Sequence, residues 1–122
     1  MFHIHVGYKN PNPYASVNLV KYMDLCVGVP SVLYDTDTFR RTLYGRAGSF
    51  RLPKYGVEYR TLSSYMLNDD YLGMIYDQTM SAIQMFNDGV DLPDGDIIEN
   101  CINNHNQTLA KHIINLYHLC VE

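Results

Sequence analysis

The chain has 122 residues and a formal net charge of −4 at pH 7, with 47% hydrophobic and 18% charged residues. These values suit one soluble globular domain, here residues 1–122, and exclude a disordered, collagen-like or coiled-coil protein. No apolar run approaches the ~18 residues of a membrane helix, so we expect no membrane association. The acidic balance also argues against direct nucleic-acid binding.

The three cysteines indicate a reducing compartment. Cys26, Cys101 and Cys120 lack CxxC spacing, lie in apolar helical patterns and cannot all pair within one chain. The N-terminal residues do not have the pattern of a signal peptide. We therefore expect buried reduced thiols in a cytoplasmic protein.

The first predicted element is a strand at residues 2–8. Its apolar residues alternate with His3, His5 and Gly7. Because successive side chains of a strand point to opposite faces, one face is apolar and the other carries two imidazoles.

A helix is predicted next. Asn12 can cap it with Pro13 at its first position, and apolar residues then follow at helical spacing. Gly28 and Pro30 are expected to interrupt this helix, and residues 29–34 to form a second, short one.

The middle of the chain is predicted to hold a helix, a loop and a strand. The helix covers residues 38–44, and the loop at residues 46–54 is rich in Gly and Arg. The β-branched and aromatic content of residues 56–62 predicts the second strand. Glu58 and Arg60 share one face of that strand.

Three helices follow in the last third. Asp69 or Asp70 can cap the first helix, which Gly89 ends. Pro93 and Asp94 start the second, and Asn106 caps the third. Two strands and several helices predict the α+β class. The positions expected to be buried are Leu72, Ile75, Tyr76, Thr79, Ile83 and Phe86, then Ile97, Ile98, Cys101 and Ile102, then Leu109, Ile113, Leu116 and Cys120.

Two short motifs could carry chemistry. His3 and His5 would lie ~6.5–7 Å apart on one strand face, where they could share a metal ion or bind an anion. Glu58 and Arg60 could be a metal ligand beside a phosphate clamp. The alternatives are a structural pair of histidines and a plain salt bridge.

A basic cluster lies between the two strands. It holds five of the nine basic residues within fifteen positions, and its glycines allow close approach of the backbone to an anion. The alternative is a solvated basic loop. The cluster consists of Arg40, Arg41, Arg46, Arg51 and Lys54.

Four stretches carry a resemblance to a known family: residues 2–8 (FHIHVGY), 28–33 (GVPSVL), 40–51 (RRTLYGRAGSFR) and 55–63 (YGVEYRTLS). In this order they resemble the C-terminal half of the phage-associated amidoligases, or COOH–NH2 ligases, of the glutamine synthetase and glutamate–cysteine ligase superfamily. The resemblance covers about the first seventy residues. It implies a small antiparallel sheet covered by helices, and the cytoplasm of a host cell as the location.

The resemblance also implies a chemistry and a set of site residues. Such ligases use ATP and Mg²⁺ or Mn²⁺ to activate a carboxylate as an acyl phosphate, which an amine then attacks. This chemistry depends mainly on positioning and charge neutralisation. The resemblance implies that His3 and Glu58 bind the metal and that His5 lies beside the nucleotide or the substrate carboxylate. It implies that Arg46 and Arg51 contact the nucleotide phosphates and that Arg60 is the catalytic residue that steadies the phosphoryl group.

The chain departs from the family at its start. It begins one residue before the His-x-His strand, whereas further metal-binding Glu residues of the family lie on earlier strands. We therefore expect a truncated ligase module that is inactive alone, that binds or works with a partner supplying the missing half, and that could hold no cofactor. The alternative is a non-catalytic phage inhibitor of a host defence system, as anti-CRISPR proteins are.

The first strand also predicts an interaction. Without its family neighbours, the strand at residues 2–8 should have an open edge, and it contains no Lys or Pro to protect that edge. We expect a homo-oligomer or a protein partner that pairs with it.

Overall fold

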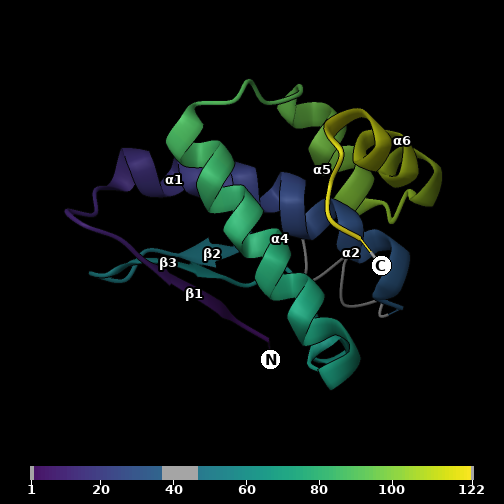
Figure 1. The fold of residues 1–122 in the computed structure, drawn as a ribbon, viewed down its shortest axis with the longest axis horizontal. Coiled ribbons are helices and arrows are strands. Elements are labelled where there is room, and N and C mark those ends of the chain that lie inside the picture. The colour runs from purple at the N-terminus through teal and green to yellow at the C-terminus, as the bar shows by residue number, and fades with distance from the viewer. Residues whose placement is uncertain (1, 37–46, 122) are drawn as a thin grey trace.

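The computed structural model describes residues 2–36 and 47–121, which form a small sheet with helices packed around it (Figure 1). The three strands are β1 (Ile4–Gly7), β2 (Phe50–Arg51) and β3 (Gly56–Tyr59), in the order β1-β3-β2. Both pairings are antiparallel. The predicted α+β class, a small antiparallel sheet covered by helices, is confirmed.

The register of the sheet brings distant residues together. His5 pairs with Glu58 across β1 and β3, and Arg51 pairs with the same Glu58 from β2. The two predicted strands are present but shorter than expected. β2 was not predicted, because two residues are too few for a recognisable alternation.

The first helix begins as predicted. In α1 (Pro13–Met23), the side chain of Asn12 accepts a hydrogen bond from the N–H of Ala15 at 2.9 Å, and Pro13 occupies the first turn. This is the usual way to satisfy a free N–H at a helix start.

The second short helix predicted at residues 29–34 is confirmed as α2 (Val29–Tyr34), but the interruption before it is a change of helix type and not a break in the chain's helical path. The chain runs from α1 through a π-helical segment, η1 (Asp24–Gly28), directly into α2 (Val29–Tyr34). The N–H of Val29 donates to the carbonyl of Asp24, five residues back, so the turn is wider than in an α-helix. Pro30 is the second residue of α2 and follows this wider turn.

Gly28 is instead a packing position. A Cβ atom there would lie 2.7 Å from the hydroxyl of Tyr59 and 2.8 Å from the side chain of Ile102. The absence of a side chain therefore lets β3 and α5 (Gly95–Asn103) both approach the π-helical segment. The core around it includes Leu19, Met23, Leu25, Val27 and Leu62, each at most 1% exposed.

The long helix α4 (Asp69–Asp88) differs from its prediction at one end and on one face. Its cap is Asn68, whose side chain accepts from the N–H of Asp70 at 2.9 Å, so neither predicted aspartate caps it. It follows a short 3₁₀ turn, η2 (Ser64–Met66), and ends at Gly89 as predicted. Ile75 and Thr79 are buried as expected, with Met74, Gln78 and Ala82, whereas Leu72 and Tyr76 are exposed.

The last two helices, α5 and α6 (Gln107–Tyr117), pack against α2. Asn106 caps α6 as predicted, and Asp94, which was predicted only to start α5, is its cap. Ile97 and Leu116 were expected inside but are exposed, because each helix is covered on a narrower face than its apolar pattern suggests. The other predicted helix, at residues 38–44, lies outside the described residues.

Within the described ranges, no helix combines the length and the apolar character needed to cross a membrane. All three cysteines are free thiols, with Cys26 and Cys101 buried and Cys120 half-buried.

Candidate functional site

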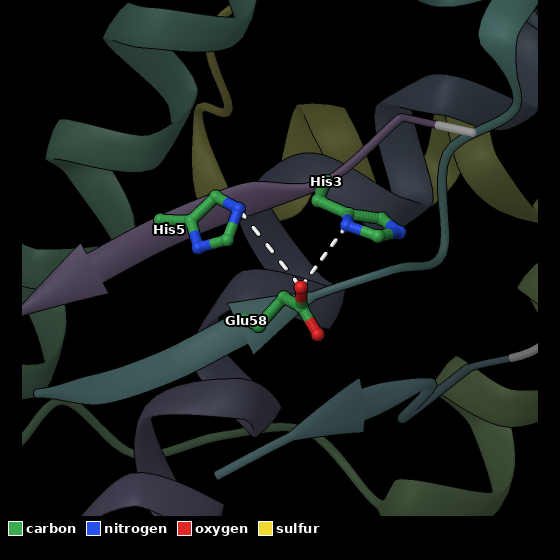
Figure 2. A group of neighbouring side chains, drawn as sticks. All are labelled: His3, His5 and Glu58. Carbon is green, nitrogen blue, oxygen red and sulfur yellow. Dashed lines mark ion pairs between the residues drawn. The ribbon is translucent and has the colours of Figure 1, made fainter. Parts of the chain in front are cut away.

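The site is built on one face of the β1–β3 pair. His3 and His5 are two residues apart, so their side chains lie on the same face, and the register places Glu58 opposite His5. Figure 2 shows both imidazoles turned toward the same carboxylate oxygen. The Nδ1 atom of His3 lies 3.0 Å from Oε1 of Glu58, and the Nε2 atom of His5 lies 3.9 Å from it.

This geometry could hold a metal ion. One nitrogen from each histidine and one oxygen of Glu58 all lie within 4.8 Å of one another. Glu58 is 14% exposed in its side chain, whereas His5 is 53% exposed, so the cluster opens to solvent on the β1 side. The family resemblance implied that His3 and Glu58 share a metal, and the structure brings these two residues together with His5.

Tyr55 orients His5. The Nδ1 atom of His5 forms a hydrogen bond with the Tyr55 hydroxyl, which leaves Nε2 on the side of Glu58. Holding one ring nitrogen while the other faces a ligand is a common arrangement around metal-binding histidines. Sequence reasoning missed Tyr55, because it lies fifty positions from His5 and no local pattern marks it.

His3 has one nitrogen still available. Its Nε2 atom is buried and finds no hydrogen-bond partner within the described part of the chain. Figure 2 shows this nitrogen on the far side of the ring from Glu58. A buried polar atom without a partner is costly, which favours a ligand or solvent contact there.

Arg51, rather than Arg60, is the guanidinium that pairs with Glu58. The Nε atom of Arg51 lies 3.9 Å from Oε2 of Glu58, and its side chain is 67% exposed. An exposed pair at this distance is weak, so Arg51 is free to contact an anion instead.

The other two arginines predicted for the site are Arg60 and Arg46. Arg60 follows β3, and its N–H donates to the carbonyl of Ser49 at 2.7 Å. Among the ion pairs between described residues, none joins Arg60 to Glu58. Arg46 lies outside the described residues, as do Arg40 and Arg41.

Asp24 and Asn103, which sequence reasoning missed, form hydrogen bonds with the backbone just before β2. Asp24, which is 8% exposed, accepts hydrogen bonds at Oδ1 from the hydroxyl of Tyr59 at 2.6 Å and from the N–H of Gly48 at 3.1 Å. Asn103 of α5 accepts from the N–H of Ala47 at 2.7 Å. These contacts anchor the segment that leads to Arg51, and they depend on tertiary packing alone.

Cys26 is unsuited to nucleophilic chemistry. Its sulfur lies 3.3 Å from the sulfur of Met85, and burial raises the pKa of the thiol to about 12. A thiol with that pKa stays protonated at neutral pH, and the thiolate is the reactive form. The expectation of a buried reduced thiol is confirmed at this position.

The family model of the phage phiEco32-like COOH-NH2 ligase-type 2 proteins matches residues 2–85, which confirms the resemblance read from the sequence motifs. The matched residues run from just before β1 almost to the end of α4 and include the His3, His5 and Glu58 cluster. The helices α5 and α6 follow the matched part. No curated protein and no solved structure matches the chain.

Proposed function

Because the chain belongs to the phage phiEco32-like COOH-NH2 ligase-type 2 family, we propose that it serves the ATP-dependent joining of a carboxylate to an amine. The observation that supports this most is the convergence of His3, His5 and Glu58 on one sheet face. In this proposal the three side chains hold a divalent cation beside the phosphates of the nucleotide.

The donor set fits a divalent cation, with a preference. Two imidazole nitrogens and one carboxylate oxygen suit Mn²⁺ or Zn²⁺ better than Mg²⁺, which prefers oxygen ligands and keeps several waters. A bound cation would supply positive charge that neutralises phosphate oxygens.

The neighbouring residues would position the nucleotide. Arg51 is exposed and only loosely paired with Glu58, so its guanidinium can turn to a phosphate. Tyr55 keeps the His5 ring in one orientation. Arg46 and Arg60 retain the roles implied by the family resemblance, as phosphate ligand and phosphoryl-positioning residue.

We further propose that the isolated chain lacks ligase activity. The described cluster contains a single carboxylate, whereas phosphoryl transfer between highly charged groups needs a fuller set of oxygen ligands around its cations. A partner would supply them.

The cation site can be tested by calorimetry with Mn²⁺, in the absence and presence of ATP. We expect wild-type protein to bind Mn²⁺, and Glu58→Gln and His5→Ala to weaken that binding at least tenfold. His112→Ala is the matched control, because His112 is exposed on α6, outside the cluster. Equal Mn²⁺ affinity in all four proteins would refute the proposed site.

A further inference from the structure

Along one side of β1, the backbone groups have no hydrogen-bond partner among residues 2–36 and 47–121. β1 is an edge strand of the described sheet, and the N–H of Tyr8 donates to the carbonyl of Tyr55 at 3.1 Å. In an antiparallel strand, the backbone groups of every second residue bond to the same neighbouring strand. The N–H and C=O groups of residues 4, 6 and 8 therefore point toward β3. By the same alternation, the backbone groups of His3, His5 and Gly7 point away from the sheet.

A groove of about 490 Å³ lies between this edge and α4. Three side chains at its border are exposed although apolar: Leu72 at 39%, Tyr76 at 65% and Met80 at 46%. They are four residues apart, so they form one line along the helix, which we call the α4 stripe. Figure 1 shows α4 passing beside the sheet on the side of β1, and the stripe and the strand line the same groove.

We propose that two copies of this chain pair through the β1 edge and the α4 stripe around a two-fold axis. The two β1 strands would lie antiparallel and centred on His5, because that register uses the outward backbone groups of His3, His5 and Gly7 in both copies. The two three-stranded sheets would then form one continuous sheet.

A second copy fits this surface because both of its parts are self-complementary. One two-fold axis sets the strand edges antiparallel and also the α4 stripes, so that Leu72 of one copy approaches Met80 of the other. Neither residues 2–8 nor the α4 stripe contains Lys, Arg, Asp or Glu. Two acidic molecules can therefore meet here without opposing or burying formal charges, and the edge carries no protective Lys or Pro.

The pairing also affects the cluster on the sheet face. The Cα atoms of the two His5 residues would lie about 5.5 Å apart, as in any hydrogen-bonded antiparallel pair. The two His3, His5 and Glu58 clusters would then adjoin on the same face. The contacts that form the dimer involve no cation, so this inference goes beyond the proposed function and does not depend on it.

Analytical ultracentrifugation in EDTA tests the proposal. The protein concentration is varied over roughly 1 to 100 µM, which covers the dissociation constants of weak to moderate dimers. We expect a dimer. Gly7→Pro removes an outward N–H that β3 does not use, and Tyr76→Lys places a charge in the α4 stripe. Tyr14→Lys is the matched control, because Tyr14 is 90% exposed on α1 and does not line the groove.

Each of the two interface variants should raise the dimer dissociation constant at least tenfold, while Tyr14→Lys leaves it unchanged. Far-UV circular dichroism identifies any variant that fails to fold. If Gly7→Pro does not fold, the proposal is tested with Tyr76→Lys alone, because Tyr76 is exposed. Amide exchange at His5 and Gly7 should slow as concentration rises. A monomeric wild-type protein, or a dimer that Tyr76→Lys leaves intact, would overturn the proposal. Mn²⁺ binding is measured separately, so failure of the cation site does not affect this result.

Discussion

Asp24 is the buried acid on which the geometry around β2 and β3 depends. Its carboxylate accepts hydrogen bonds from Tyr59 and from the backbone of Gly48, and thereby ties the π-helical segment to the strand that carries Glu58. The wider π turn occurs at the residue that makes these contacts, a common association with functionally constrained positions.

Asp24→Ala should therefore destabilise the protein. Leaving buried donors unpaired costs roughly 1–3 kcal/mol each, so we expect the free energy of unfolding to fall by at least about 2 kcal/mol. Urea denaturation measures the change. Asp77→Ala is the control, because Asp77 is exposed on α4, and it should stay within about 0.5 kcal/mol of wild type. Similar losses in both variants would show that the Asp24 network contributes little.

Cys26 predicts a dependence of stability on alkaline pH. Burial raises the pKa of its thiol from 9.0 to about 12, so the unfolded chain releases this proton at a lower pH than the folded protein. Below pH 9, the buried thiol contributes fully to the stability of the folded protein. Between pH 9 and pH 12 this contribution is lost, and the free energy of unfolding falls by up to ~1.4 kcal/mol per pH unit.

Replacing the thiol should remove that loss. Urea denaturation between about pH 8 and about pH 10.5, which spans the ordinary thiol pKa of 9.0, should give a smaller decline in stability for Cys26→Ala than for wild type. Cys120→Ala, which retains Cys26, should follow the wild-type decline. Parallel curves for Cys26→Ala and wild type would show that the thiol does not resist ionisation in the folded state.

At the scale of the elements, two glycines have opposite roles. Gly56 begins β3 with φ of +149°, and a Cβ there would lie 2.3 Å from the carbonyl oxygen of Val6. Gly73 lies inside α4, where a Cβ would meet no atom within 4 Å. The first glycine is required by close strand approach, whereas the second only lowers helix propensity.

The same substitution at these two sites should change stability in opposite directions. Gly56→Ala should lower the free energy of unfolding by at least about 2 kcal/mol, because Val6 and β1 must move away. Gly73→Ala should raise it by about 0.5–1 kcal/mol through helix propensity. Thermal and urea denaturation of the two variants provide matched measurements. A neutral Gly56→Ala would mean that the β1–β3 contact tolerates a wider spacing.

At the scale of the whole molecule, we expect no ligase turnover from the isolated chain. Purified protein with ATP, Mg²⁺ or Mn²⁺ and a panel of amino acids should release no more ADP than Glu58→Gln does, because the described cluster offers one carboxylate. ADP release that requires an amine and disappears in Glu58→Gln would contradict this expectation and would make the chain a complete catalyst.

Much of the fold could be predicted from local patterns. The alternation at residues 2–8 predicts that His3 and His5 share a face, and Asn12 and Asn106 cap helices as expected. The errors occur where periodicity does not report which neighbour covers a face. Tyr76 fits the apolar pattern of α4 but remains exposed, because β1 is the last strand of the sheet in the part of the chain that the structure describes, and a groove lies between it and the helix.

The sequence by itself determined the family and the residue types of the candidate site, since both depend on motifs read along the chain. Only the tertiary structure decided which of these residues meet. The β1–β3 register sets His5 opposite Glu58, β2 brings Arg51 rather than Arg60 to that carboxylate, and Tyr55 orients His5. These pairings join segments far apart in the chain, and their energies depend on how strands and helices pack, which no local pattern encodes.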